Sequence, residues 1–486
     1  MVGVAGKSQG CNTCRKRKVK CDGERPSCGQ CRKGKRVCGG YQRDRHFKNL
    51  SALDHDTLLA RTQPLAPITQ PSAIIYSDVV GEEGKRESQE QTPQEQPNIE
   101  ALFFYLPPVS WLQALAPLQG TNSSFDIAMS ALSMVRLGRQ SGNETLRREG
   151  LANYGKALEG LQKVLSNGKL VFQEQTLAAS MTLSIFEVLE VSGETTYGWI
   201  SHIEGISRLF QLRGPKMHVS ESGHLLFQGF RPTGILYALA TRKATYLADQ
   251  DWLTIPWTTM PKSDFHHLLD IMAKIPTLAE ATERISKESN SQDIDSQWIE
   301  CLRRNWDVHN QLDNFYEELS RRSTEQLYTE TPATIFCTKS NIELEDIFPV
   351  SLHFPTFEIA RIHLFYWAAL LWIHNNISIL QPSPSSPTTP SQQPLLTCSL
   401  EIATQIAQSM QYLLSPEMHT RGPQNVFHPL RIAQQVFSKK DQDGREVKWC
   451  KGVFEEVDAR GYPFGKILSG WDWDNIPVLL STGGSL

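Results

Sequence analysis

Six cysteines near the amino terminus have a spacing that suits metal chelation. They form the pattern Cys-x2-Cys-x6-Cys-x6-Cys-x2-Cys-x6-Cys, a pseudo-repeat made of Cys11, Cys14 and Cys21 and of Cys28, Cys31 and Cys38. A Cys-x2-Cys turn brings two sulfurs within reach of one metal ion, and soft thiolates favour zinc. Six thiolates give two tetrahedral Zn²⁺ ions four ligands each only if two sulfurs bridge the metals. The pattern therefore predicts a binuclear cluster with two Zn²⁺ per chain and no open coordination position.

Lysines and arginines occupy most positions in the two six-residue gaps that precede Cys21 and Cys38. Five of the six residues before Cys21 are basic, as are four of the six before Cys38. These residues are Arg15, Lys16, Arg17, Lys18, Lys20, Arg32, Lys33, Lys35 and Arg36. Almost no apolar side chain remains to build a core, so the metal ions must replace one. Small domains of this kind fold only with zinc bound.

Two other uses of six cysteines fit this segment less well. A disulfide scaffold, for which six cysteines allow fifteen pairings, needs an oxidising compartment. The first ten residues, MVGVAGKSQG, lack the apolar stretch of a signal peptide, so we expect no secretion. A catalytic zinc keeps an exchangeable coordination position, and the predicted cluster has none.

Charge is distributed unevenly along the chain. The 486 residues carry a formal net charge of −3, but residues 1–48 contain fourteen Lys or Arg and three Asp or Glu, a formal +11. The rest of the chain carries 35 basic and 49 acidic residues, a formal −14. A compact basic segment on an acidic body is typical of a nucleic-acid-binding module joined to a different kind of domain.

The cysteine-rich segment closely resembles the fungal binuclear zinc-cluster family, usually called Zn2Cys6. The resemblance rests on the run Cys-Arg-x-Arg-Lys-x-Lys-Cys-Asp at 14–22, on Arg25-Pro26-x-Cys28 and on the closing Cys-x2-Cys-x6-Cys. It implies that Cys11 and Cys28 bridge the two metal ions. The ligands that complete the two sites would be Cys14 with Cys21, and Cys31 with Cys38.

The same resemblance implies that residues 15–20 form a short helix whose end enters the DNA major groove. Arg17 and Lys18 occupy the positions that read bases, and guanine O6 and N7 are natural acceptors for a basic donor there. Arg15 and Lys20 would bind phosphates, which fixes the register without reading sequence. The family's usual half-site is a CGG triplet. Useful specificity then needs a second contact, from a homodimer through the helical body or from a partner protein.

Composition divides the rest of the chain into a linker and a body. Residues 49–97 contain several prolines and a polar, charged run nearly free of apolar residues, which predicts a disordered linker. Leucines after the cluster keep no 3.5-residue period over three heptads, so we expect no coiled-coil zipper. From 98 to 486 the periodicity is helical and no useful strand pattern appears, which predicts a large all-α domain. Within it, the Pro/Ser/Thr-rich stretch at about 381–394 predicts a disordered loop.

Apolar periodicity places the helices of the body. The first four are expected to end near Gly138, to follow Asn143, to span about 173–191 and to close at Arg213. Later helices are expected near 232–249, 263–286, 296–322, 356–380, 399–414, 424–438 and 446–456. The ten apolar residues Leu364–Ile373 are too few to cross a bilayer. We interpret them as a buried core helix and expect no membrane partner.

The body is similar to the helical fungal-specific transcription factor domain that accompanies zinc clusters. The similarity lies in Tyr154-x2-Ala157-Leu158-x2-Leu161 and in Trp199-x2-His202-x2-Gly205-x3-Leu209-x3-Arg213-Gly214. Taken by themselves, Trp199, His202 and Gly205 share one side of a helix. A lone histidine on such a face is interpreted as a hydrogen-bonded packing residue rather than as a ligand or base.

Motifs of common enzymes are missing from the sequence. It contains no nucleophile elbow, no His-Glu-x2-His and no phosphate-binding glycine loop, so we expect no catalysis. The leading hypothesis is a nuclear regulator that binds double-stranded DNA and acts on RNA polymerase II genes with the transcription machinery or co-regulators. The alternative is an interaction or corepressor scaffold, whose helical body carries the function while the cluster tethers it weakly to DNA.

Overall fold

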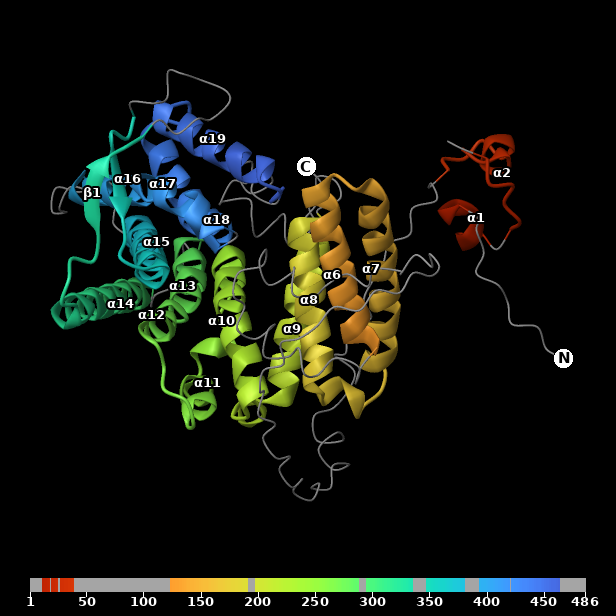
Figure 1. Cartoon of the computed structure of the whole chain (residues 1–486), viewed down its shortest axis with the longest axis horizontal. Helices are drawn as coiled ribbons and strands as arrows, with labels where there is room; N and C mark the ends of the chain where they lie inside the picture. Colours follow the sequence, from red (N-terminus) through yellow and green to blue (C-terminus); the bar gives the residue numbers. More distant parts are fainter. Residues whose placement is uncertain are drawn as a thin grey trace, which may run out of the picture. The chain divides into compact units, whose positions relative to one another are not determined.

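The chain forms two compact units, Met1–Ser72 and Ala73–Leu486 (Figure 1). The computed structural model describes residues 11–17, 19–24, 27–38, 123–190, 197–287, 294–334, 347–380, 393–419 and 421–463. The expected linker at 49–97 and the start of the expected body, up to residue 122, lie outside the described residues. So does the expected loop at 381–394, except for its last two residues, which begin helix α16 (Gln393–Gln408).

Two five-residue helices form the described secondary structure of the first unit. They are α1 (Asn12–Lys16) and α2 (Gly29–Lys33), and each follows a cysteine directly. Helices of this length are not stable in isolation. Their positions must therefore be set by what the cysteines do.

Four long helices begin the described part of the second unit. They are α6 (Ser123–Ser141), α7 (Glu144–Leu165), α8 (Glu174–Leu189) and α9 (Tyr197–Arg213), close to the four expected from periodicity. Helix α6 packs on α7 and α8, and α8 packs on α9 (Figure 1). Gly150 on α7 lets α6 approach closely, because a Cβ atom there would lie 2.7 Å from Cγ2 of Val135.

The turn between α6 and α7 has the residues that its geometry requires. Gly142 adopts a φ of +65°, a conformation that is costly for other residues. Asn143 then caps α7, because its side chain accepts a hydrogen bond from the backbone N–H of Leu146 at 3.0 Å. This cap confirms the expected start of the helix.

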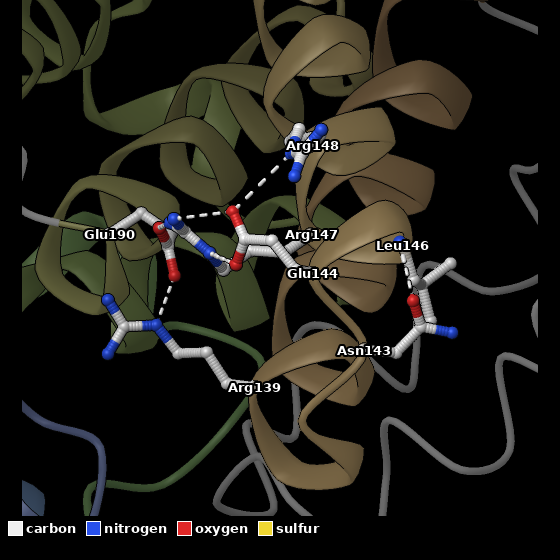
Figure 2. A network of polar contacts seen from close by, with 7 residues as sticks. All are labelled: Arg139, Asn143, Glu144, Leu146, Arg147, Arg148 and Glu190. Carbon is white, nitrogen blue, oxygen red and sulfur yellow. Dashed lines mark hydrogen bonds and ion pairs between the residues drawn. The ribbon is translucent and has the colours of Figure 1, made fainter.

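A buried carboxylate joins the first three of these helices (Figure 2). Glu190 directly follows α8, and its side chain is 3% exposed. It accepts hydrogen bonds from Nε of Arg139 on α6 and from Nη1 of Arg147 on α7, the second at 2.7 Å. Arg147 also contacts Glu144 at 2.9 Å. Charge-assisted bonds of this kind compensate the loss of hydration of the buried carboxylate.

The next helices differ from expectation where proline occurs. Helix α10 spans Glu221–Thr241 and holds Pro232 in its interior, whereas we expected a helix to start there. We expected the start there because proline is common in the first turn of a helix. The expectation was wrong, since the helix begins after Ser220, whose side chain caps it by accepting a hydrogen bond from the backbone N–H of Gly223. The single helix expected over 263–286 is two helices, α12 (Asp264–Met272) and α13 (Ile275–Lys287). Pro276, which has no N–H to donate, lies in the first turn of α13.

One helix is the centre of the remaining structure. Helix α15 (Phe357–Leu380) packs against α12, α13, α14 (Ile294–Arg322), α16 and α18 (Arg421–Lys440). Every residue from Leu364 to Ile373 is buried, which confirms the predicted core helix. Its neighbours belong to one apolar core that extends from Phe125 on α6 to Tyr462, after α19 (Arg445–Ala459).

Shorter elements complete the second unit. The helix expected over 399–414 is divided between α16 and α17 (Met410–Leu413), and α11 spans Gln250–Thr254. Short 3-10 helices lie at Leu170–Phe172, Pro215–His218, Tyr246–Ala248, Ile255–Trp257 and Pro416–Met418. Strand β1 (Thr329–Pro332) pairs antiparallel with β2 (Val350–His353), a ribbon that the sequence did not predict because its strands have only four residues. Of the described helices, none is both long and apolar enough to cross a membrane.

Candidate metal centre and nucleic-acid interface

The two short helices of the first unit are each capped by a cysteine sulfur. Sγ of Cys11 accepts a hydrogen bond from the backbone N–H of Cys14 at 3.4 Å, and Sγ of Cys28 accepts one from Cys31 at 3.3 Å. Each Cys-x2-Cys sequence is therefore the first turn of a helix. This local geometry turns the two sulfurs of each pair toward the same point.

The six sulfurs gather into two groups of four. One group is Cys11, Cys14, Cys21 and Cys28, the other is Cys11, Cys28, Cys31 and Cys38, and within each group the sulfurs lie within 4.8 Å of one another. The sulfur of Cys11 lies 3.6 Å from that of Cys28 and 3.8 Å from that of Cys31. Four sulfurs at about 2.3 Å from a tetrahedral zinc are roughly 3.8 Å apart. The donor set thus fits two zinc ions that share two sulfurs.

Burial disfavours the thiolate form of two of these cysteines when no metal is bound. Burial raises the pKa of the Cys14 thiol and, more strongly, that of Cys28. A bound cation reverses this preference, because it stabilises the thiolate and releases the proton. Metal binding here therefore has to displace thiol protons, and its affinity should fall as the pH falls.

Asp22 is a structural residue of this site to which the sequence analysis assigned no role. Its Oδ1 accepts a hydrogen bond from the backbone N–H of Gly29 at 3.0 Å, at the start of α2. Asp22 lies close against position 29, where a Cβ in place of glycine would lie 2.5 Å from its Oδ2 and displace this side chain. Glu24 and Arg32 form an ion pair beside it. The sequence holds one signal for this role. Asp22 directly follows a cysteine of the motif, and a carboxylate can stabilise the N-terminal N–H groups of a helix such as α2.

The basic residues of the first half lie at the end of α1 and after it. The helix stops at Lys16, so the expectation that residues 15–20 form it is wrong in register. The physical reason is the sulfur cap at Cys11, which starts the helix three residues earlier. Lys16, Arg17 and Lys20 are exposed. Lys18 and the side chain of Arg15 lie outside the part of the chain that the structure describes.

A second exposed basic group lies in the other half of the pseudo-repeat. Arg32, Lys33, Lys35 and Arg36 all expose their side chains. Arg36 donates its backbone N–H to the carbonyl of Cys31 at 3.0 Å, which folds the chain back over the end of α2. Both basic segments are thus held by neighbours of the cysteines, and their described side chains are exposed at the surface, although Arg32 is paired with Glu24.

In the second unit, the residues that carried the body's resemblance meet in the helix interfaces. The hydroxyl of Tyr154 on α7 lies 3.2 Å from Nε2 of His202 on α9 and donates to Glu187 on α8. Burial lowers the pKa of His202 to about 4. The imidazole is therefore neutral near pH 7 and packs between helices. This confirms the interpretation of His202 as a hydrogen-bonded packing residue.

Arg213, at the end of α9, has the same structural character. Its guanidinium donates to the carbonyl of Phe172 and approaches that of Met217 at 3.5 Å. Gly214 follows with a φ of +70°, which ends the helix. The polar side chains of this motif therefore connect neighbouring helices and turns.

Comparison with known proteins agrees with both parts of the structure. The family described as "Fungal Zn(2)-Cys(6) binuclear cluster domain" matches residues 9–46, and the family described as "Fungal specific transcription factor domain" matches residues 104–419, well over half of the chain. A relative from Emericella nidulans, "Uncharacterized protein AN5342", is 31% identical over 146 residues. That match covers 30% of this chain and only 31% of the length of the relative. No solved structure matches the chain.

These matches agree with the shared cysteine quartets and with the largely helical core. The clustered sulfurs and the first match together indicate a zinc-binding domain. The chain belongs to the fungal-specific transcription factor family and carries that family's helical domain behind an amino-terminal binuclear zinc-cluster domain.

Proposed function

We propose that the protein is a nuclear, sequence-specific DNA-binding regulator of genes transcribed by RNA polymerase II. The observation that carries the proposal is the pair of cysteine quartets that share Cys11 and Cys28, flanked by exposed basic side chains. A rigid metal cluster with basic residues on its surface presents positive charge at fixed positions. Phosphate neutralisation by such residues supplies most of the non-specific affinity for DNA.

Each cysteine has a role in this proposal. Cys11 and Cys28 bridge two Zn²⁺ ions, because they are the members common to both quartets. Cys14 and Cys21 complete one tetrahedron, and Cys31 and Cys38 complete the other. Two zinc ions per chain replace the apolar core that this domain lacks.

Specific recognition is assigned to the segment around the end of α1. An α-helix fits the major groove, where the O6 and N7 atoms of guanine accept from basic side chains. We assign base reading at CGG-type half-sites to Arg17 and Lys18, and phosphate contacts to Arg15 and Lys20. The exposure of Arg17 and Lys20 supports this assignment.

The helical body is assigned a regulatory role in place of a catalytic one. In this scheme residues 1–48 bind DNA, 49–97 are a linker and 98–486 regulate. A single cluster reads only a triplet, so a second contact is required. The body provides it by forming a homodimer or by binding co-regulators and the transcription machinery.

A DNA-binding titration with the full-length, zinc-loaded protein tests this proposal. Fluorescence anisotropy compares duplexes that hold two CGG triplets, in direct, inverted and everted orientation at several spacings, with duplexes of equal composition and scrambled triplets. We expect at least one arrangement to bind tighter, since each mismatched base pair costs about 1–3 kcal/mol. Loss of binding on zinc chelation is the control. Equal affinity for every duplex at 150 mM salt would contradict the proposal.

A further inference from the structure

Two histidines meet in the interface between α14 and α15, far from the cysteine cluster in sequence. Nε2 of His309 on α14 lies 3.2 Å from Nε2 of His374 on α15. Their rings are nearly parallel, with an interplanar angle of 13° and centroids 5.3 Å apart. The distance is that of a direct interaction, so the protonation of the two nitrogens decides whether it is attractive.

Polar contacts at the other ring nitrogens decide that protonation. Nδ1 of His374 lies 2.9 Å from Oγ of Ser399, whose own proton goes to the carbonyl of Leu395 at 2.7 Å. Ser399 must therefore accept, and Nδ1 of His374 carries the proton. Nδ1 of His309 lies 3.0 Å from Oδ2 of Asp313 but is not aligned for a hydrogen bond. A carboxylate this close still favours a proton on that nitrogen, because an ionised carboxylate is only an acceptor. In the neutral state, both rings then present a bare lone pair at Nε2.

Other polar pairs of the same helix interface match a donor with an acceptor. Asn376 donates its side-chain amide to Oδ1 of Asn305 at 3.1 Å. The hydroxyl of Tyr316 lies 3.3 Å from Nε2 of His363, whose Nδ1 is satisfied by the carbonyl of Ile359 at 2.8 Å. At the two histidines, by contrast, one acceptor faces another. A cation between the two nitrogens removes this conflict.

We propose that His309 and His374 chelate a divalent transition-metal ion, such as Zn²⁺ or Ni²⁺, through their Nε2 atoms. Imidazole nitrogens suit such ions. Two nitrogens bound at about 2.0–2.1 Å to one tetrahedral metal stand roughly 3.3 Å apart, close to the distance between these two atoms. Asp313 contacts Nδ1 of His309 and Ser399 contacts Nδ1 of His374. Metal-bound histidines commonly have such a partner at the nitrogen that does not bind the metal. Water completes the coordination.

The surroundings of the pair favour a cation and leave it reachable. The side chain of His309 is 18% exposed and that of Asp313 44%. Cys398 lies close by, and its pKa is raised by burial and by the carboxylates of Glu401 and Asp313. The local charge is therefore negative. A bound ion would join α14 to α15 and make the stability of the helical body depend on a metal that the cysteine cluster does not hold.

Calorimetric titration of the full-length protein with Ni²⁺ tests this site. The cysteine cluster is first loaded with Zn²⁺, and a chromogenic chelator reports any zinc that Ni²⁺ displaces. We expect one further Ni²⁺ per chain, no zinc release, and a higher midpoint of thermal unfolding when Ni²⁺ is present. His309→Gln should weaken this binding at least tenfold. His267→Gln, which changes an exposed histidine on α12, is the matched control and should leave it unchanged.

A second variant separates loss of the ligand from loss of the fold. Asp313→Asn changes a half-exposed side chain that contacts His309 and does not touch the metal, and should weaken Ni²⁺ binding by about 10–100-fold. The inference is overturned if the wild type binds no additional ion, if its binding releases zinc from the cysteines, or if both variants bind Ni²⁺ as tightly as the wild type. Absence of additional ion binding by the wild type would mean that the two histidines share a proton.

Discussion

In the described part of the first unit, the buried side chains are those of Cys11, Cys14, Cys28 and Cys31, whereas the second unit buries a continuous apolar set from Phe125 to Tyr462. The first unit gains its order from a few directional bonds between sulfur and metal. The second gains it from many weak contacts, each buried methylene contributing about 0.8 kcal/mol. A domain that needs no apolar core can give its whole surface to charge. The difference explains how a short segment can be both folded and densely basic.

Polar groups in the two regions also serve different purposes. In the described part of the first unit the basic side chains are exposed. In the second unit, buried charges are paired inside the protein. Arg231 is fully buried and pairs with Asp270, and Glu190 is held by Arg139 and Arg147. The same residue types are exposed at the surface in one region and join helices in the other.

Removal of zinc should produce the largest difference between the two units. Chelation in the full-length protein should unfold the first unit, because metal binding supplies about 10–16 kcal/mol in domains of this type. The second unit should stay folded. All eleven tryptophans lie at or after residue 111, so tryptophan fluorescence reports the second unit alone. Hydrogen exchange should show lost protection at residues 11–38 with little change in fluorescence. Simultaneous loss of both signals would mean that the units are not independent.

Truncation of a core side chain should destabilise the second unit and leave the first unit unchanged. Phe210 on α9 is buried and stacks on Phe230 with ring centroids 4.7 Å apart. Phe210→Ala should lower the free energy of unfolding of the second unit by about 3–5 kcal/mol. Urea titration followed by tryptophan fluorescence measures this change, while zinc content should not change. Ile299→Ala is the control, since Ile299 is 61% exposed and its truncation should cost less than about 0.5 kcal/mol.

Acid should destabilise the second unit through its buried histidines. Burial lowers the pKa of His202 from its ordinary value of 6.5 to about 4, so the unfolded chain binds more protons than the folded one between these values. Stability therefore rises with pH through this window and is lost as pH falls from 6.5 toward 4, with about 2 kcal/mol lost from His202 by pH 5. His202→Gln should show a smaller drop in unfolding free energy between pH 7 and pH 5. His267→Gln, which changes an exposed histidine, should show the same drop in unfolding free energy as the wild type. Equal drops in the two variants would contradict the contribution of His202 to acid destabilisation.

The smallest expected effect concerns the basic surface of the first unit. Lys18→Ala should cost about 1–3 kcal/mol on the cognate DNA and relax sequence preference. Lys20→Ala should weaken all sequences alike and lower the salt slope by about one. Lys451→Ala, an exposed lysine on α19, is the control in the second unit and should leave DNA binding unchanged. Equal weakening of specific and random DNA by Lys18→Ala would show that the roles are wrongly assigned.

The sequence alone determined the class of both regions. The spacing of six cysteines predicts the metal and its binuclear arrangement, because chelation by Cys-x2-Cys is a local property of a few bonds. The run Leu364–Ile373 predicts a core helix, because helical periodicity and apolar content are also local. Helix starts with a strong cap, such as Asn143 before α7, were predictable for the same reason.

Only the tertiary structure decided the features that depend on distant or competing contacts. Two local caps competed with stronger sequence signals and were missed: the sulfur of Cys11 starts the helix Asn12–Lys16 among the basic residues, and Ser220 starts α10 well before Pro232. The contact of His309 with His374 joins residues that are 65 positions apart. No local pattern encodes such a pair, because it forms only when two helices pack in one particular register. What a few neighbouring residues decide can be predicted from sequence, and what packing decides cannot.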